Sequence, residues 1–302
     1  MKVEAQEEAQ AVAPAYPDDL RALVEDCLSK LRFSDERSIA GLAEAMRYSL
    51  LAGGKRIRPV LTLATASALG RDPAEVLPTA AAIELIHTYS LIHDDLPAMD
   101  DDELRRGRPT CHVAYGENVA ILAGDGLFAE AYNLVLHHQP GDPAPVLSAL
   151  REISEAIGVG GMVGGQYVDV AGAADLDADG LRRMHELKTG RLIGASIAVA
   201  PILLGAPEEA QLALGRFSGE LGVLFQIVDD ILDVTGSDEE LGKPSGSDER
   251  HGKLTYVSAF GLDRARELAT ESHQAAVAAL DEAAPRTDDL RTITDFIHTR
   301  HA

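Results

Sequence analysis

The sequence predicts an all-α fold, a bundle of helices, on the strength of three observations. Ala, Leu, Glu and Arg recur at spacings of three and four residues along most of the 302-residue chain. Alternating β-branched runs that end in hairpin turns, the usual signal of strands, are missing. Several of the helical stretches are apolar nearly all round, and such helices belong in the interior of a bundle.

The first three predicted helices are residues 40–52, 59–69 and 80–95. The stretch AGLAEAMRYSLLA has helical periodicity, and Pro59 can occupy the opening position of the second helix. The third, AAAIELIHTYSLIHDD, is apolar on every side until it reaches an acidic end. The next two, residues 118–138 and 145–158, are similarly rich in Ala, Leu and Ile.

Three further helices are predicted at residues 181–205, 208–236 and 262–280. The last of them is amphipathic and follows a charged segment, Gly236–Lys253, which is rich in Gly and Ser and is expected to be a mobile loop. Glycine pairs at 160–161 and 164–165 follow no strand, so they indicate close helix packing near Gln166 and Asp169 rather than a phosphate loop. Gly124 and Gly126 are interpreted in the same way.

Length and composition predict one large domain. The chain is 46% hydrophobic, which is enough to build a sizeable core over residues 18–302. Residues 1–17 are expected to form a disordered tail. The N-terminus lacks an apolar signal core, and no later segment is judged long and apolar enough to span a bilayer, so a cytoplasmic location is expected.

The net charge of −22 argues against nucleic acid or an anionic membrane as a partner, because both are bound by excess Lys and Arg. Cys27 and Cys111 are too few for a disulfide framework or a zinc cluster. An anionic ligand must therefore be held by local basic residues or by a metal ion.

The segment His93–Glu103 (HDDLPAMDDDE) is strongly acidic. It places six carboxylates within ten residues, where they repel one another unless a cation lies among them or they extend into water. On a regular helix Asp95 and Asp100 would diverge by roughly 140° and could not share a metal. Pro97 breaks the helix, so we expect an irregular segment that brings Asp100 back toward the cluster.

A second acidic cluster contains Asp229, Asp230 and Asp233 in FQIVDDILD. The flanking residues are apolar, so these carboxylates interrupt a buried surface and need partners. Two such clusters on apolar helices indicate a shared metal site. Carboxylate oxygens without His or Cys at ligand spacing suit magnesium, which completes its shell with water and phosphate oxygens.

Basic residues that could hold phosphate occur in three places. They are GGKRIRP with Lys55, Arg56 and Arg58, LRRGRP with Arg105, Arg106 and Arg108, and the charged segment with Lys243 and Lys253.

Together these motifs resemble the trans-isoprenyl diphosphate synthase family, which includes farnesyl and geranylgeranyl diphosphate synthases. The motifs in order are GGKRIRP, HDDLPAMDDDELRRGRPTCH, the KTG of 188–190, FQIVDDILD and LGKPSGSDERHGKLTY. The likeness runs from about Leu20 to the C-terminus and is strongest to the bacterial farnesyl enzymes, which also have four residues between the aspartates of the first motif. It implies a helical bundle around a central apolar cavity, and a homodimer.

The resemblance implies head-to-tail condensation of isopentenyl diphosphate with an allylic diphosphate, with magnesium as cofactor. It assigns Asp94, Asp95, Asp100 and Asp229 as metal ligands, and Asp230 and Asp233 as ligands or their supports. The implied substrate-binding residues are Arg105, Lys188, Lys243 and Lys253 for the allylic diphosphate, Lys55, Arg58, His87 and Arg106 for isopentenyl diphosphate, and Thr189 and Gln226 facing the cation.

Tyr89 and Ser90 lie five and four residues before Asp94, which places Tyr89 about 7.5 Å below the acidic cluster along the helix. An aromatic ring there would limit chain length. In the resembled family a tyrosine at this position is typical of a C15 synthase, so we expect farnesyl diphosphate as the product, with geranylgeranyl diphosphate as the alternative.

Three other functions fit parts of the sequence. A terpene cyclase would share the fold, but its second metal motif usually mixes Asn, Ser or Thr, and Glu. A non-catalytic prenyl synthase subunit typically lacks one aspartate motif, and both are present here. A calcium-binding interaction protein would leave the Lys and Arg clusters unexplained.

Overall fold

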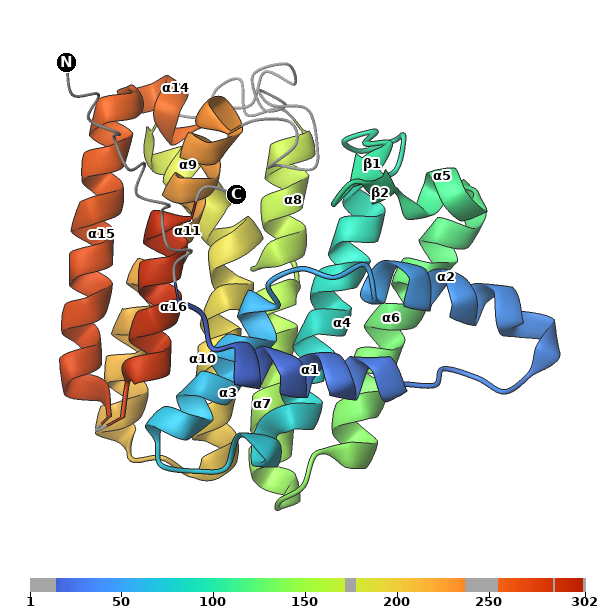
Figure 1. The fold of residues 1–302 in the computed structure, drawn as a ribbon, viewed down its shortest axis with the longest axis horizontal. Helices are drawn as coiled ribbons and strands as arrows, with labels where there is room; N and C mark the ends of the chain where they lie inside the picture. The colour runs from blue at the N-terminus through green and yellow to red at the C-terminus, as the bar shows by residue number, and fades with distance from the viewer. Residues whose placement is uncertain (1–14, 172–177, 237–254, 285, 301–302) are drawn as a thin grey trace, which may run out of the picture.

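The computed structural model describes residues 15–171, 178–236, 255–284 and 286–300. In these ranges the chain is a bundle of helices with one two-stranded hairpin (Figure 1), so the all-α prediction is confirmed. The elements are α1 (Asp18–Lys30), η1 (Arg37–Ile39), α2 (Ala40–Leu50), α3 (Ile57–Ala68), η2 (Pro73–Val76), α4 (Leu77–Asp94), β1 (Leu104–Arg105), β2 (Arg108–Pro109), α5 (Cys111–Tyr115), α6 (Glu117–His138), α7 (Pro143–Ile157), α8 (Met162–Val170), α9 (Ala178–His185), η3 (Glu186–Gly190), α10 (Arg191–Leu204), α11 (Glu208–Thr235), α14 (Tyr256–Phe260), α15 (Leu262–Ala283) and α16 (Asp288–Thr299).

All eight predicted helical stretches are helical in the structure. The stretch 181–205 differs in one respect, because η3 is a π-helix that separates α9 from α10. Helices α1, α5, α8, α14 and α16 lie outside the predicted stretches. Helix α8 was concealed by its glycines, which lower helix propensity but are accommodated here by tertiary packing.

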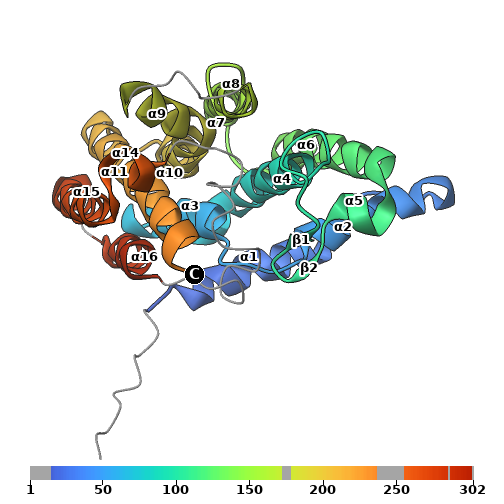
Figure 2. The ribbon, with the colours of Figure 1, turned by 90° about the horizontal axis from the view of Figure 1, so that it is seen from above.

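Helix α3 lies near the centre of the bundle. It contacts α10, α4, α16 and α1, while α11 packs against α15 and α10, and α4 packs against α6. Seen from above, α11, α15 and α16 lie on one side of α3, and α4 and α6 lie on the other (Figure 2). The acidic ends of α4 and α11 therefore belong to different sides of the bundle.

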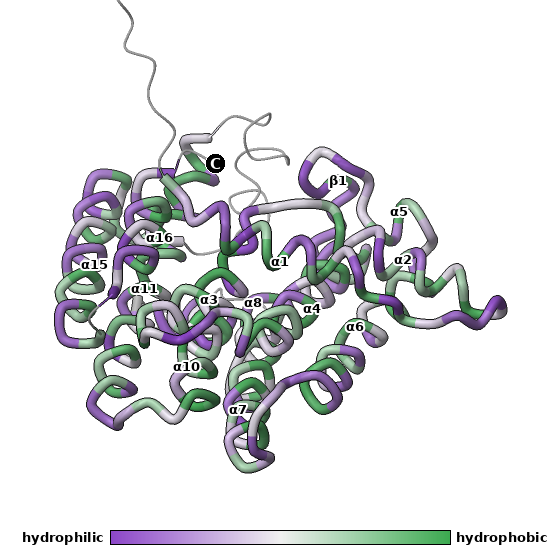
Figure 3. The backbone as a smooth tube through the Cα atoms, turned by 60° about the horizontal axis from the view of Figure 1, so that its bottom comes forward, coloured by the Kyte–Doolittle hydropathy of each residue, from purple (hydrophilic) through white to green (hydrophobic). Residues whose placement is uncertain are grey.

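Burial follows the apolar pattern of each helix. Helix α4 is buried on several sides and contributes Ala81, Leu85 and Tyr89 to the core. The outer helix α15 buries one stripe, which includes Ala269 and Leu280, and alternates between hydrophilic and hydrophobic residues along its length (Figure 3). Such single-stripe burial is typical of a surface helix.

Two of the glycines expected to allow close packing do so. A Cβ on Gly165 would lie 2.3 Å from the backbone nitrogen of Lys188, and a Cβ on Gly124 would lie 2.1 Å from Nε2 of His93. Gly165 therefore lets α8 contact η3, and Gly124 lets α6 accept the imidazole from α4. Gly160 meets no atom within 4 Å, so the packing interpretation does not hold for that residue.

The packed structure begins before residue 18. The ring of Tyr16 contacts Phe296 edge-on at 4.9 Å, and its hydroxyl donates to the carbonyl oxygen of Lys55 at 2.8 Å. The expected tail included Tyr16, which instead ties the start of the chain to α16. The rest of the tail prediction, residues 1–14, lies outside the described residues.

Two helical stretches are long and apolar enough to cross a membrane by length and composition, which corrects the expectation that none is. They are Glu117–His138 and Asp179–Leu204, each with a mean hydropathy of 1.4. Both pack within the bundle, since α6 contacts α4 and α2, and α10 contacts α7 and α3.

Arg56 is the most deeply buried of the paired arginines. Its guanidinium donates to Glu84, to Glu25 and to the carbonyl oxygen of Leu50, each at 2.8 Å, and its side chain is 1% exposed. Its backbone is left-handed, with φ of 55°. This residue joins α1, the end of α2 and α4, and so fixes the loop that precedes α3.

Replacing Arg56 by Ala is expected to destabilise the fold by about 3–5 kcal/mol, because the carboxylate of Glu84 would be left buried without its partner. Urea unfolding followed by circular dichroism measures the change. Arg216→Ala is the control, because it removes an arginine from an exposed pair with Glu282 and should cost under about 1 kcal/mol. Equal losses for the two variants would contradict this role for Arg56.

Candidate active site

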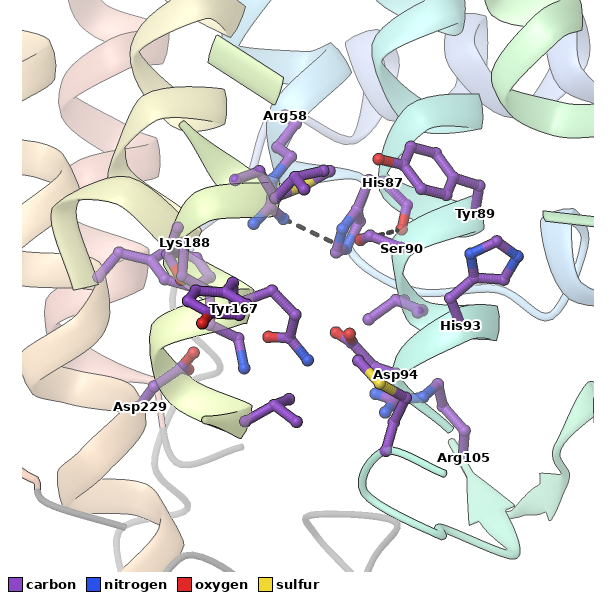
Figure 4. A pocket seen from close by; sticks show the side chains of 18 of the residues that line it. Arg58, His87, Tyr89, Ser90, His93, Asp94, Arg105, Tyr167, Lys188 and Asp229 are labelled. Carbon is purple, nitrogen blue, oxygen red and sulfur yellow. Dashed lines mark hydrogen bonds between the residues drawn. The ribbon is translucent and has the colours of Figure 1, made fainter. Parts of the chain in front are cut away.

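A cavity of about 710 Å³ opens between α4 on one side and α8, η3 and α11 on the other. Its size is typical of a small-molecule site. Asp94 and Arg105 project into it from one wall, and Lys188 and Asp229 from the other (Figure 4). The predicted site residues that line it are Arg58, His87, Tyr89, Ser90, Asp94, Arg105, Arg106, Lys188, Thr189 and Asp229.

The first acidic motif has the predicted irregular segment. Helix α4 ends at Asp94, turns follow through Pro97, and the backbone nitrogen of Asp100 donates to the carbonyl oxygen of Asp94 at 2.9 Å. This bond confirms that the chain folds back at Asp100. The exposed carbonyl end of α4 adds negative potential beside Asp94, which favours a bound cation.

Asp94 is in an environment that opposes its negative charge. Burial, opposed by Lys188 and supported by the nearby Asp100 carboxylate, raises the pKa of its carboxyl to about 6. A divalent cation at this position would lower that pKa and relieve the repulsion.

Asp95 does not face the main cavity. Its carboxylate accepts two hydrogen bonds from Nε of Arg105, at 2.8 and 2.9 Å, and one from Nη2 at 2.5 Å, and the residue is 3% exposed. Burial raises the pKa of Asp95, and the Arg105 guanidinium opposes that rise. The structure thus places Asp95 as the support of Arg105 rather than beside Asp94 in the cavity.

The second acidic motif is divided in the same way. Asp229 lines the main cavity, whereas Asp230 and Asp233 are 1% and 5% exposed within α11. The carboxylate of Asp230 accepts hydrogen bonds at 2.7 Å from Nε2 of Gln226 and from the backbone nitrogen of Tyr256. Asp230 therefore joins α11 to α14.

Arg58 and His87 form a basic pair in the wall of the cavity. Nη1 of Arg58 lies 3.2 Å from Nε2 of His87. Burial lowers the pKa of both groups, and the positive charge of Arg58 lowers the pKa of His87 further, so the imidazole is neutral and accepts this hydrogen bond. Nε of Arg58 is buried and has no hydrogen-bond partner among the described residues, so it can donate to an anion.

Arg106 is held by the glycine pair that precedes Lys55. It donates to the carbonyl oxygen of Gly53, and a Cβ on Gly54 would lie 2.7 Å from the centre of its guanidinium. Burial lowers the pKa of Arg106, as expected for a cation that lacks a full carboxylate partner. Gly54 is therefore required for the position of Arg106.

Lys188 lies in the π-helix η3, a feature frequently found at functional sites. Its ammonium donates to the carboxylate of Asp169 at 2.6 Å, and the Asp169 side chain is 5% exposed. The sequence placed Asp169 beside the packing glycines, and the structure makes it the partner of Lys188. Thr189, the next residue of η3, lines the cavity.

Two predicted substrate-binding residues lie elsewhere. The Lys55 ammonium lies over the ring of Phe296, 5.1 Å from its centroid, and does not line the cavity. Gln226 lines a second cavity of about 680 Å³ behind η3. Lys243 and Lys253, together with most of the expected mobile loop, fall outside the described residues.

Two cavity residues had no signal, or a weak one, in the sequence. Arg300 follows α16 and pairs with Asp229, but no motif surrounds it. Gln166 lines the cavity from α8, and neither polar atom of its buried amide has a hydrogen-bond partner in the part of the chain that the structure describes. The glycines beside Gln166 were its only marker.

An aromatic group forms part of the cavity wall. Tyr89 is 9% exposed, and its ring contacts Phe128 of α6 edge-on at 5.2 Å and the imidazole of His93 at 5.7 Å. Phe128 contacts Tyr132 at 5.4 Å. Tyr89 is therefore backed by a second layer of rings rather than by space.

The residues of the cavity fit a magnesium ion whose coordination shell is completed by a bound ligand. In the described part of the chain, no group of three or more His, Cys, Asp or Glu side chains could hold a metal by itself. Asp94 and Asp229 nevertheless offer carboxylate oxygens from opposite walls. Magnesium is typically bound by one or two carboxylates together with water and phosphate oxygens, which matches this donor set.

A helical bundle with carboxylates and arginines around one cavity is the arrangement expected of enzymes that bind diphosphates together with magnesium. Residues 40–296 match the family profile described as polyprenyl synthetase. The chain belongs to this family, whose members elongate prenyl chains by prenyl transfer.

Relatives of both product classes are similar to this chain. Farnesyl diphosphate synthase of Geobacillus stearothermophilus is 44% identical over 86% of this chain and 88% of its own length. A chloroplastic geranylgeranyl pyrophosphate synthase of Capsicum annuum is also 44% identical, over 85% of this chain and 71% of its own length.

Solved structures share the fold. Geranyltransferase from Helicobacter pylori, complexed with magnesium and isoprenyl diphosphate, has a TM-score of 0.83 at 33% identity and covers 93% of this chain and 94% of that one. Geranylgeranyl pyrophosphate synthetase from Pyrococcus horikoshii has a TM-score of 0.84 at 34% identity, over 93% and 96% of the two chains.

Asp94→Asn is expected to stabilise the metal-free protein at neutral pH. Because the folded-state pKa is raised to about 6, the folded wild type binds more protons than the unfolded chain between about pH 4 and 6, and its stability falls as the pH rises through that window. The variant should gain about 1–2 kcal/mol above pH 7 and little near pH 4. Urea unfolding in chelator from pH 4 to 8 measures this, and a gain independent of pH would contradict it.

Proposed function

We propose that this protein is a magnesium-dependent synthase that joins isopentenyl diphosphate head to tail with dimethylallyl and then geranyl diphosphate to form farnesyl diphosphate. The observation that carries the proposal is one cavity with Asp94 and Asp229 on opposite walls and Tyr89 in its lining. Arg58, Arg105, Arg106 and Lys188 line the same cavity.

The basic residues divide between two diphosphates. Arg105 and Lys188, each held by a buried carboxylate, lie near the acidic groups and are assigned to the allylic diphosphate. Arg58, His87 and Arg106 form the other group and are assigned to isopentenyl diphosphate. Fixed partners orient these donors in advance, so little reorganisation is needed when charge develops on the leaving group.

The allylic carbon–oxygen bond breaks to give a carbocation and diphosphate. Magnesium, when bound, would stabilise the negative charge of the departing diphosphate. Thr189 offers a hydroxyl dipole on the cavity wall. The double bond of isopentenyl diphosphate then attacks the carbocation and forms the new carbon–carbon bond, and the resulting cation loses a proton to restore a double bond. The released diphosphate is the proposed acceptor of that proton, so the reaction requires no side-chain base.

Tyr89 supports farnesyl diphosphate as the product, because its ring lines the cavity about one helical turn before Asp94, where it would limit a growing chain. Burial raises the pKa of Tyr89 to about 12, and the Asp94 charge acts in the same direction, so the phenol is neutral. Geranylgeranyl diphosphate is the alternative, since relatives of that product class are equally similar.

Incubation of the full chain with magnesium, isopentenyl diphosphate and dimethylallyl diphosphate tests the function, and sizing the dephosphorylated alcohols tests the product. Wild type should give C15, and Tyr89→Ala should give longer chains. Tyr132→Ala is the control, because it removes a ring from the same group without lining the cavity. A C20 wild-type product would overturn the product assignment, and absence of turnover would favour a non-catalytic subunit.

Arg106→Ala is expected to weaken isopentenyl diphosphate binding about 10- to 150-fold, the loss of about 1.5–3 kcal/mol from charge-assisted hydrogen bonds. Gly54→Ala should weaken it in the same direction by displacing the guanidinium. Arg108→Ala is the control, because Arg108 stacks on Tyr48 away from the main cavity. Calorimetry with each substrate measures affinity, and an equal loss for the allylic substrate would show that Arg106 is wrongly assigned.

A homodimer is also proposed, and the surface of α6 supports it. Leu122 and Leu136 of this apolar helix are 54% and 57% exposed. A second copy of the chain would cover them, and sedimentation equilibrium of wild type and Leu122→Glu tests this.

The cytoplasmic location stays a prediction, which cell fractionation tests.

A further inference from the structure

Arg300 places a cation against one of the two cavity carboxylates. It follows the last turn of α16, and its Nη2 donates to Oδ1 of Asp229. The arginine side chain is 11% exposed, whereas that of Asp229 is 45% exposed. The guanidinium is thus the more firmly enclosed member of the pair.

Phe225 fixes the position of this guanidinium. The centre of the Arg300 guanidinium lies 4.5 Å from the ring centroid of Phe225, and that of Arg58 lies 5.8 Å from the same centroid. Burial is the main cause of the lowered pKa of Arg58, and repulsion from the Arg300 cation beside the same ring lowers that pKa further. The Asp229 carboxylate relieves this repulsion and holds Arg300 in place.

The two cavity carboxylates, Asp94 and Asp229, therefore differ in how far their negative charge is already paired. Within the described residues, no side chain hydrogen-bonds to the carboxylate of Asp94, which lines the cavity. The carboxylate of Asp229 is already partly neutralised by Arg300. A divalent ion that approaches Asp229 meets a positive charge on its intended ligand.

We propose that Arg300 is a built-in counterion of Asp229 that magnesium must displace, and that it lowers metal affinity at this carboxylate relative to Asp94. Arg300 is a positioning residue in this role, and it lies outside the 40–296 family match. The inference rests on the proposed function, in which Asp229 is a metal ligand. It makes metal binding sequential, with the Asp94 side filled before the Asp229 side.

Manganese binding to the full chain without substrate tests the proposal, with free Mn²⁺ measured by electron paramagnetic resonance. Arg300→Gln should tighten binding at the weaker site about 3- to 10-fold, the size expected for a partly exposed ion pair. Arg300→Lys should give a smaller change, because the charge remains while the planar fork is lost. Arg216→Gln is the control. Arg216 lies in α11, as Asp229 does, but pairs with Glu282 on the surface, so its loss should change binding less than about 2-fold.

A double-mutant cycle with Asp229→Asn separates direct pairing from general charge. In the Asp229→Asn background, Arg300→Gln should have no further effect on manganese binding. An equal tightening in both backgrounds would overturn the proposal, since the effect would then be long-range electrostatics. If Asp229→Asn weakens binding and Arg300→Gln does not tighten it, Arg300 is no counterion although Asp229 remains a ligand. If Asp229→Asn leaves binding unchanged, the ligand assignment itself fails and the proposal fails with it.

Discussion

The buried guanidinium of Arg56 is the interaction on which the rest of the site depends. Charged groups between apolar helices are tolerated only where each has a fixed partner, and Glu84, Glu25 and the Leu50 carbonyl oxygen provide those partners for Arg56. That network anchors the Gly53–Gly54 turn, and the turn in turn holds Arg106. Positions at the cavity are thus set by a charge cluster that never touches the cavity itself.

The sequence predicted the helices and the cavity carboxylates because both depend on local patterns. Apolar periodicity located α4 and α11, and the break at Pro97 predicted the return of Asp100 toward Asp94, which the structure confirms. The pattern could not predict in which direction each aspartate side chain of a motif points. Neighbouring aspartates such as Asp94 and Asp95 look alike in sequence, yet one faces the cavity and the other binds Arg105.

The remaining differences arise from contacts that are distant along the chain. Lys55 stacks on Phe296, and Arg300 reaches Asp229, 71 positions away in sequence. No local spacing encodes such contacts, because they form only when α16 packs beside α3 and α11. The π-helix at Lys188 is similar, since its extra residue is stabilised by close packing against Gly165 and carries no propensity signal.

Helix α6 contributes both to the wall behind Tyr89 and to the outer surface of the protein. One side of it carries Phe128 behind Tyr89, and another part of its circumference exposes Leu122 and Leu136 to the outside. His93 fixes this helix to α4 through the space left by Gly124. A substitution that moves α6 therefore changes both the cavity wall behind Tyr89 and the exposed apolar surface, so the two cannot vary independently.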